Sequence, residues 1–424
     1  MNWFPFVILG EFLDWQSYPK TIAHKPIHLL VRCIGSWYYP IHLAERCIGL
    51  NIGHTVKQPL GYRAFIPSAF PPADLSWSAE TSARLETANL MLGRLDGITE
   101  LLPDVDFFIF MYVKKESALS SQVEGTQATI ADAIRAESEI RYGLPNDVDD
   151  ILRYVSAMNL GLLQLNEIPL SLRLLRNVHR ELLAGGRSHG HVSPGEFRTS
   201  QNWIGGSSPN NARYVPPPPH EMQIALSELE KFLHQEDSLP KLIKAALAHA
   251  QFETIHPFLD GNGRTGRLLI TFFLCEQRIL SKPVLYLSEF FREHREFYFD
   301  LLNGYHGRNE VEPWLSFFLD GVAEVSERAI ATARAVAKIQ LRDTEKIASF
   351  GRTSKVALVL LRHLFKVPIV SVRNVEGVTG LSRANANKLV AKFVDAKLLT
   401  VTDETLDYGR QFAYLEYLQL FTSE

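Results

Sequence analysis

The segment His256-Pro-Phe-Leu-Asp-Gly-Asn-Gly-Arg-Thr-Gly-Arg267 combines glycines, an asparagine, two arginines, an aspartate and a histidine. Its central part, Gly261-Asn262-Gly263, can turn successive backbone N–H groups toward one point, because glycine accepts positive φ and asparagine tolerates it. Such a concavity binds anions. The apolar residues that follow at helical spacing predict a helix, whose N-terminus also favours negative charge: Leu268, Leu269, Phe272 and Phe273. The sequence therefore predicts a phosphate site at this loop.

Four side chains of the same segment carry the functional groups that a nucleotide site needs. His256 is a potential general base, Asp260 offers oxygen to a hard cation, and Arg264 and Arg267 are guanidiniums. Taken singly, a Gly-Asn-Gly is usually a turn, and a histidine before proline more often ends a helix than performs chemistry. The combination within one segment indicates a site where phosphates meet Mg²⁺.

The segment resembles the Fic family signature H-P-F-x-[D/E]-G-N-G-R-x-x-R at every defined position. The resemblance implies a mainly α Fic-fold helical bundle, and transfer of AMP from ATP to a Tyr, Ser or Thr hydroxyl of a protein, including this chain itself. It makes His256 the base and Asp260 the ligand of a Mg²⁺ cofactor. The α-phosphate would lie at 261–263, the β-phosphate at Arg264 and the γ-phosphate at Arg267. The nucleotide-binding residues that it implies are Gly261, Asn262, Gly263, Arg264, Thr265, Gly266, Arg267 and Phe299. Phe299 is preferred over Tyr298 and Tyr305 as the adenine contact.

Two further segments gain meaning beside the signature. Ser120-x-x-x-Glu124-Gly125 would by itself be a solvated helix ending at a glycine, but it resembles the inhibitory motif [S/T]-x-x-x-E-[G/N] of Fic proteins. The resemblance implies that Glu124 occupies Arg267 and blocks ATP. The β-capable runs 201–204 and 212–215 predict a hairpin, which would otherwise be a surface loop. It resembles the Fic flap, on which a target segment docks as an added strand, through Trp203, Ile204, Gly205 and Gly206.

The C-terminal region predicts a winged helix-turn-helix domain. The segment 379–393 resembles the turn and second helix of a helix-turn-helix, and 398–402 and 412–415 are suited to the strands of a wing. Basic and amide side chains on the second helix favour DNA binding: Arg383, Asn385, Asn387, Lys388 and Lys392. A protein-interaction or dimerisation module is an equal alternative, so DNA and a second copy of the chain are both partners to consider.

Composition narrows the remaining possibilities. The 424 residues have a net charge of −3 and three cysteines, which argue against a nucleic-acid-coating protein, a disulfide framework or a zinc site. No apolar run approaches the roughly 18 residues of a membrane span, so a cytoplasmic protein is expected. The rival functions are a nucleotide-sensing transcription regulator and removal of AMP in the same site.

The expected organisation has four parts. Residues 1–57, which lack periodicity, are either a small accessory segment or an upstream region included by a misplaced start near Val56-Lys57, with the second preferred. A Fic N-terminal region with the inhibitory helix follows over 58–147, a catalytic core over 148–345 and the winged-helix domain over 352–424. Amphipathic helices are expected over 78–95, from Phe107, on both sides of Pro169, over 222–233 and 241–254, in one long helix through 294–302, and over 312–337.

Overall fold

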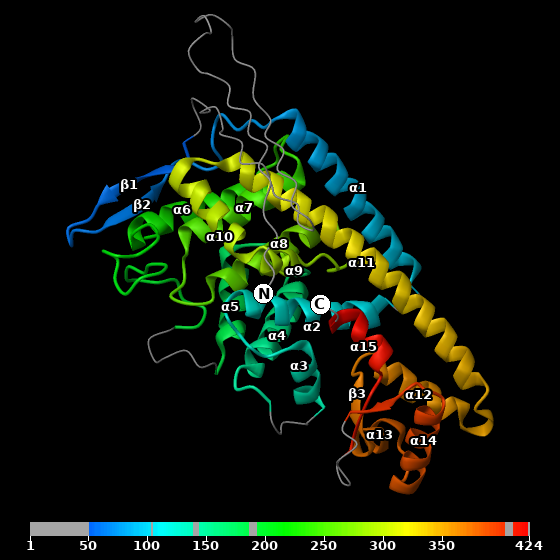
Figure 1. Cartoon of the computed structure of the whole chain (residues 1–424). Helices are drawn as coiled ribbons and strands as arrows, with labels where there is room; N and C mark the ends of the chain where they lie inside the picture. Colours follow the sequence, from blue (N-terminus) through cyan, green and yellow to red (C-terminus); the bar gives the residue numbers. More distant parts are fainter. Residues whose placement is uncertain (1–50, 103–104, 139–143, 186–192, 403–409, 423–424) are drawn as a thin grey trace, which may run out of the picture. The chain divides into compact units, whose positions relative to one another are not determined.

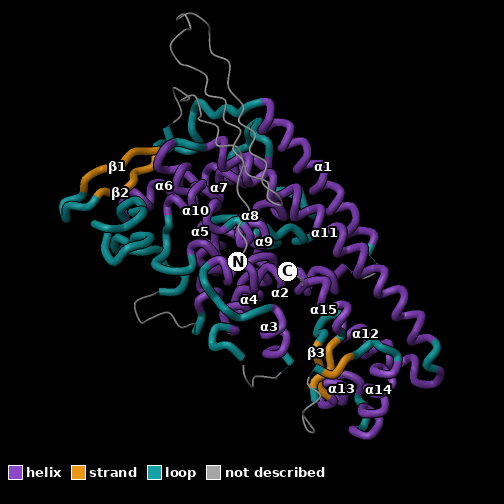
Figure 2. The backbone as a smooth tube through the Cα atoms, in the orientation of Figure 1, coloured by secondary structure: helices purple, strands orange, loops and turns teal. Residues whose placement is uncertain are grey.

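The computed structural model describes residues 51–102, 105–138, 144–185, 193–402 and 410–422 (Figure 1). Helices dominate these residues, and their strands belong to two short sheets (Figure 2). The mainly α fold expected from the sequence is therefore confirmed. None of the described helices is both long and apolar enough to cross a membrane.

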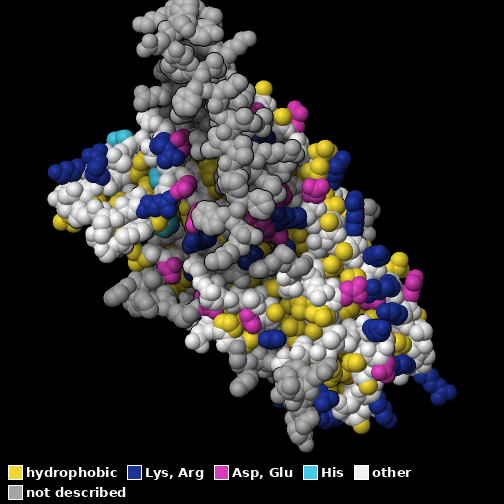
Figure 3. Space-filling view, in the orientation of Figure 1, with side chains coloured by type: hydrophobic (Ala, Val, Ile, Leu, Met, Phe, Trp, Pro, Cys, Tyr) yellow, Lys and Arg dark blue, Asp and Glu magenta, His cyan; other side chains and the backbone are white. Residues whose placement is uncertain are grey.

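Two long helices, α1 (Ala79–Leu101) and α11 (Val311–Ala348), pack side by side along much of their length (Figure 1). Ser78 caps α1, because its hydroxyl accepts a hydrogen bond from the backbone N–H of Thr81. Glu312 ties the two helices together by accepting bonds from the Ser78 N–H and the Thr81 hydroxyl, both 2.7 Å long. On the face shown in Figure 3, acidic and basic side chains are interspersed over this pair.

The helices that surround the signature segment form the core of the molecule. They are α2 (Val105–Val123), α3 (Ile130–Glu137), α4 (Val148–Gln164), α5 (Leu172–Leu183), α6 (Pro219–His234), α7 (Lys241–Ile255), α8 (Asn262–Glu276), α9 (Ser288–Glu293) and α10 (Arg295–Arg308). Helix α7 is buried on nearly all sides, so it is a central element against which α6, α8, α10 and α11 pack. The helix expected through 294–302 is present as α10, but it begins at Arg295, because the backbone leaves helical geometry at His294 (φ −109°, ψ 33°) and a separate short helix, α9, precedes it.

An N-terminal hairpin was not foreseen from the sequence. Strand β1 (Gly53–Lys57) pairs antiparallel with β2 (Arg63–Pro67), with Gly53 opposite Pro67 and Lys57 opposite Arg63. The preceding Ile52 is buried, and its N–H donates to the Asn309 side chain at 2.9 Å. The boundary expected at residue 57 therefore cuts through a hairpin attached to the folded core. Residues 1–50 lie outside the described part of the chain.

The hairpin expected over 201–215 is reduced to a single antiparallel bridge between Ile204 and Tyr214. Two of its residues use their side chains elsewhere: Gln201 donates to the Pro216 carbonyl, and Asn202 to the carbonyls of His256 and Phe258. The segment thus folds as a loop anchored to the signature, and we call residues 201–215 the bridge loop.

The C-terminal elements have the order and pairing that a winged helix requires. After the 3-10 turn η1 (Gly351–Thr353) come α12 (Ser354–Leu364), β3 (Ile369–Ser371), α13 (Val372–Thr379), α14 (Arg383–Asp395), β4 (Thr400–Val401), β5 (Gln411–Ala413) and α15 (Leu415–Thr422). The antiparallel sheet has the order β3-β5-β4. The expected wing falls between β4 and β5, where residues 403–409 lie outside the described part of the chain.

This C-terminal unit packs against the first turns of α2. The rings of Phe107 and Phe365 stack with centroids 5.5 Å apart. The Tyr417 hydroxyl, from α15, reaches the Phe365 carbonyl at 3.0 Å and the Phe107 carbonyl at 3.4 Å. Helix α2 therefore contacts the C-terminal unit at one end, while its other end lies at the signature.

Candidate active site

His256 lies where α7 ends and the signature loop begins. Its backbone is in the left-handed region (φ 48°, ψ 61°), which is unusual for a residue with a side chain. Two residues of the preceding segment hold it there: the Arg198 Nε donates to the His256 carbonyl at 2.9 Å, and the Asn202 amide to the same oxygen at 3.3 Å. Hydrogen bonds from the surrounding structure, such as these two, allow a strained backbone conformation to persist.

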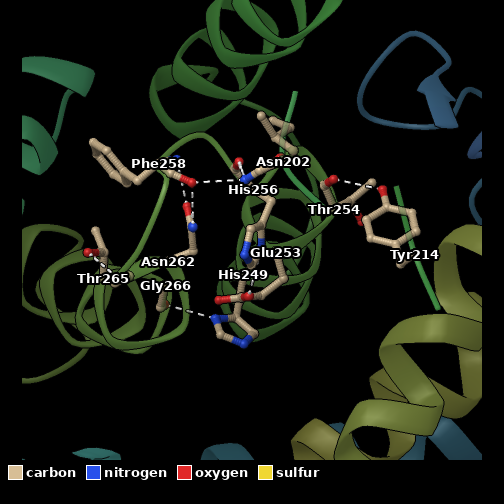
Figure 4. Close-up of polar contacts among 12 residues, drawn as sticks. Asn202, Tyr214, His249, Glu253, Thr254, His256, Phe258, Asn262, Thr265 and Gly266 are labelled. Atoms are coloured by element: carbon tan, nitrogen blue, oxygen red, sulfur yellow. Dashed lines mark hydrogen bonds and ion pairs between the residues drawn. The ribbon is translucent and has the colours of Figure 1, made fainter. Parts of the chain in front are cut away.

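The side chain of Asn262 closes the loop that follows (Figure 4). Its oxygen accepts from the Phe258 N–H and its nitrogen donates to the Phe258 carbonyl, both at 2.8 Å. The side chain that was expected beside the α-phosphate is therefore used inside the loop. The Thr265 hydroxyl is used in the same way, because it donates to the Gly261 carbonyl at 2.8 Å.

The backbone supplies the anion site. Gly261, in the left-handed conformation (φ 77°), precedes the first residue of α8. The N–H groups of 262–264 then have no intrahelical carbonyl to pair with, because a helix leaves its first turn of donors free. They point with the helix dipole toward any bound anion, as expected from the sequence.

His179, on α5, holds the backbone of this loop in place. It is fully buried, its Nε2 donates to the Asp260 carbonyl at 2.9 Å, and its Nδ1 accepts from the Gly195 N–H at 2.8 Å. Its ring stacks on Phe258 with centroids 3.6 Å apart. Burial lowers the pKa of His179 to about 4, so it stays neutral in this bonding pattern. No local pattern in the sequence signals this link between His179 and the loop.

Asp260 and Arg264 face the open side of the loop. One Asp260 oxygen accepts from the Gly261 N–H at 2.6 Å, while its side chain is 51% exposed. The Arg264 side chain is mostly buried and lies 3.9 Å from Asp260, and its Nε has no hydrogen-bond partner among the described residues. This donor is suited to an incoming phosphate oxygen.

The end of helix α2 brings Ser120, and the turn that follows it brings Glu124, to Arg267. The Arg267 Nε donates to the Ser120 hydroxyl, and its Nη2 to the Ser120 carbonyl and to a Glu124 oxygen, each at 2.8 Å. Gly263 makes this approach possible, because a Cβ there would lie 2.1 Å from the Glu124 oxygen. The sequence prediction that these segments meet agrees with the geometry, but α2 is buried rather than solvated at Ser120.

Burial and charge set the protonation states around the base. Burial lowers the pKa of His256 to about 4, against the smaller opposing effects of Glu124 and Asp260. Burial alone would raise the pKa of Glu124, but the charge and hydrogen bond of Arg267 more than offset it and hold that pKa below its usual value. Near pH 7 the site therefore contains a neutral imidazole beside an ionised Glu124–Arg267 pair.

Among the three aromatic residues weighed for adenine, two belong to the core. Tyr298 and Tyr305 are fully buried, and the Tyr298 hydroxyl bonds to His249 at 2.9 Å. Phe299 is only partly buried, and the Arg295 guanidinium lies over its ring at 5.1 Å. Arg295 also donates to the Val123 carbonyl at the end of α2. Phe299 is thus the accessible ring of the three.

The remaining predicted residues lie on two exposed surfaces. In the bridge loop, Trp203 and Ile204 are 40% and 37% exposed, and Gly205 and Gly206 both have positive φ. On α14, Lys392 turns away from the expected DNA-facing set and donates to the Phe350 carbonyl at 2.8 Å. Arg383 lies 3.5 Å from Glu376, and the other members of that set are exposed: Asn385, Asn387 and Lys388.

The helical fold and this loop define a class: a helical protein in which free backbone donors at a helix N-terminus lie next to a neutral histidine. Residues 169–274 match the Fic/DOC family, and residues 82–163 match the Fic/DOC family N-terminal region. The chain is also similar in fold to a Fic family protein from Desulfovibrio desulfuricans G20, with a TM-score of 0.51 and 16% identity, covering 80% of this chain and 97% of that one. The resemblance of the signature to the Fic family is thereby confirmed over residues 82–163 and 169–274.

Two curated relatives share part of the sequence. Protein adenylyltransferase Fic from Culex quinquefasciatus is 32% identical over 188 residues, which is 43% of this chain and 32% of that protein. Protein adenylyltransferase Fic from Drosophila grimshawi is 30% identical over 208 residues, 47% of this chain and 39% of that protein. The chain thus spans less than half the length of these relatives.

Proposed function

We propose that this protein transfers AMP from ATP to a hydroxyl of a protein, and that Glu124 holds it in an inhibited state. The observation that carries the proposal is the set of contacts at Arg267, where Ser120 and Glu124 occupy a guanidinium beside an anion-binding helix N-terminus and a neutral histidine. The two relatives that bear the name protein adenylyltransferase support the same reaction.

His256 is the proton acceptor in this proposal. A Tyr, Ser or Thr hydroxyl gives its proton to the ring as its oxygen bonds to the α-phosphorus, and the bond from that phosphorus to the bridging oxygen breaks, releasing pyrophosphate. The N–H groups of 262–264 stabilise the charge on the α-phosphate, and Arg264 binds the β-phosphate. Arg267 binds the γ-phosphate once Glu124 has withdrawn, and Phe299 lies against the adenine.

The residues present fit one Mg²⁺ held together with substrate. Among the described residues no group of three or more His, Cys, Asp or Glu side chains could hold a metal ion. Mg²⁺ commonly takes one or two carboxylates and completes its shell with phosphates and water. Asp260, half exposed and fixed by Gly261, can be that carboxylate. Bound there, Mg²⁺ would neutralise charge on the α- and β-phosphates.

The exposed edge of the bridge loop is the proposed docking site of the target. The apolar Trp203 and Ile204 of this loop are accessible, and a single bridge, from Ile204 to Tyr214, pairs its two sides. A target segment that adds as a strand here would be held mainly through its backbone, so its sequence is weakly specified. Asn202, in the same loop, fixes the His256 carbonyl and so links docking to the base.

Transfer from labelled ATP tests the proposal. With Mg²⁺, the wild type should label itself weakly, Glu124→Gly strongly, and the double variant Glu124→Gly/His256→Ala not at all. An inhibited fraction of about 99% requires roughly 2.7 kcal/mol, and one charge-assisted hydrogen bond contributes about 1.5–3 kcal/mol. The expected gain for Glu124→Gly is therefore on the order of 10–100-fold.

Glu236→Gly is the matched control, because it removes the same charge from an exposed residue in the loop after α6. It should label like the wild type. Labelling of the double variant at the Glu124→Gly level would reject His256 as the base. Absence of labelling by every variant, with both the chain itself and a cell extract offered as targets, would reject AMP transfer.

A further inference from the structure

A buried carboxyl group beside His256 has no role in the reaction described so far. Glu253 lies one turn earlier on α7, and its side chain is only 10% exposed. Its Oε2 lies 3.8 Å from the His256 Nδ1. Within the described residues, neither the other Glu253 oxygen nor the His256 Nδ1 has a hydrogen-bond partner. Figure 4 shows the Glu253 carboxyl beside the His256 ring.

The neighbouring helix leaves room for this carboxyl. A Cβ at Gly266 on α8 would lie 2.3 Å from the Glu253 Oε1, so a side chain at Gly266 would displace it. Burying a carboxyl costs free energy, and burial raises the pKa of Glu253 to about 8 against the smaller opposing effect of the Arg267 charge. The fold therefore keeps a carboxyl group whose burial costs free energy next to His256, the proposed base.

We propose that Glu253 is a positioning residue for His256, accepting a hydrogen bond from the Nδ1–H and thereby directing the unprotonated Nε2 toward the target hydroxyl. The inference rests on the proposed AMP transfer. Catalytic hydrogen bonds are often long before substrate binds and shorten in the complex, and here the gap must close by about 1 Å.

The geometry suits both stages of the proton transfer. A carboxyl group offers an acceptor oxygen whether it is protonated or ionised. When Nε2 takes the hydroxyl proton the ring becomes a cation, and the adjacent Glu253 oxygen stabilises that charge. Without an acceptor at Nδ1, the neutral ring distributes its proton between the two nitrogens, and fewer molecules present a basic Nε2.

Two substitutions in the Glu124→Gly protein separate positioning from packing. Glu253→Gln keeps an acceptor oxygen and should retain most of the activity, whereas Glu253→Met keeps the length but has no such acceptor. For the methionine variant we expect kcat to fall about 10–100-fold, the range typical for partners that orient a functional histidine, with the KM for ATP within about twofold. Equal kcat for the two variants would overturn the proposal.

Gly266→Ala provides an independent test of the same contact. The added methyl should lower kcat when Glu253 is present, because it pushes the carboxyl away. It should have little further effect in Glu253→Ala, where the oxygen is gone and only the Phe252 ring, 3.1 Å from the added carbon, must adjust. Additive losses in the double variant would contradict a role for the carboxyl.

The ring tautomer can be measured without any transfer activity. In the ¹⁵N-histidine-labelled full chain without ATP, the NMR signals lost in His256→Ala identify His256. They should report a proton on Nδ1 in the wild type and in Glu253→Gln, and a tautomer mixture in Glu253→Met. The same tautomer in all three proteins would refute the inference even if transfer is observed. The expected tautomers together with no transfer would refute only the proposed reaction.

Discussion

Arg198 is a buried cation whose hydrogen-bond acceptors are all backbone carbonyls. It donates to His256, Ser200, Pro217 and Ile255, and thereby covers the last carbonyls of α7. Burial lowers its pKa to about 10, so it remains charged at neutral pH. A charge near the C-terminal end of a helix is favourable, and this one also fixes the direction of the chain at the proposed base.

Replacing Arg198 should therefore cost both stability and activity. Arg198→Met leaves several buried carbonyls without donors, each worth about 1–3 kcal/mol, so the urea midpoint of unfolding should fall clearly. Transfer by the Glu124→Gly/Arg198→Met protein should be lost because His256 is released from its strained backbone. Arg352→Met, at an exposed arginine, is the control. An unchanged urea midpoint for Arg198→Met would show that these bonds contribute little.

At the scale of residues, the sequence revealed the groups that are proposed to contact substrate and missed the residues that hold those groups in place. His256, Asp260, Arg264 and Arg267 lie within one segment, so their combination could be recognised directly. Arg198 and His179 act on backbone carbonyls that only the folded chain brings near, and no local pattern marks such pairs. For the same reason, the internal use of the Asn262 and Thr265 side chains could not be foreseen.

At the scale of elements, α2 is the part of the fold that places the proposed inhibitory residues next to Arg267. Ser120 lies in the last turn of the helix, and Glu124 is the first residue after its end, in a turn whose Glu124 N–H donates to the Ser121 carbonyl at 3.1 Å. The helix ends at Val123, whose carbonyl accepts a hydrogen bond from Arg295, and Gly125 follows with φ 98°. Glu124, between these two residues, contacts Arg267. The end of the helix and the residue after it thus offer Arg267 three acceptors within five residues of sequence.

Ser120→Ala should relieve inhibition in part. It removes one of the three hydrogen bonds to Arg267, while Glu124 stays in place. A hydrogen bond from a charged donor contributes no more than about 1.5–3 kcal/mol. Labelling should therefore rise severalfold but remain below that of Glu124→Gly. Ser117→Ala is a matched control, because this equally buried serine bonds to the Val113 carbonyl of its own helix. If the two alanine variants label equally, the Ser120 bond does not maintain inhibition.

Most helices could be predicted because an apolar stripe of helical period marks a buried face. The failures have physical causes. The aromatic run through His294 is apolar on several sides, so its periodicity could not show the break between α9 and α10. The bridge loop forms one bridge instead of two strands because Gln201 and Asn202 pair with more distant carbonyls. Strands β1 and β2 pair with each other, although the sequence had suggested a boundary at residue 57, between them.

At the scale of the whole molecule, buried titratable groups make stability depend on pH. Burial lowers the pKa of five histidines: to about 4 for His179 and His256, to about 3 for His249 and His306, and below its usual value for His363. It raises the pKa of two glutamates, Glu116 to about 7 and Glu253 to about 8. Between roughly pH 4.5 and 6.5 the unfolded chain therefore binds more protons on the histidines, and the folded chain binds more on the glutamates.

We expect the histidines to prevail, so that stability falls as the pH is lowered through this window. The four histidines with the largest shifts, set against the two glutamates, leave a net uptake of about two protons on unfolding, which corresponds to about 2.7 kcal/mol per pH unit; His363 acts in the same direction. Urea midpoints at pH 5 and pH 6.5 measure the effect. His306→Phe, which keeps a ring stacked on Tyr214, should reduce the difference between the two midpoints. A midpoint at pH 5 equal to or above that at pH 6.5 would contradict this balance.

The contact between α2 and the C-terminal unit affects how shortened versions of the protein would behave. Removing residues 352–424 would take away the rings of Phe365, Tyr417 and Phe421, against which Phe107 and Tyr112 of α2 pack. The cut would expose an apolar surface on α2, the helix that leads directly into Glu124. Labelling gained by such a truncated chain would therefore report a loosened helix as readily as a lost regulatory partner. Point substitutions on the outer face of α14, which leave these rings in place, separate the two causes.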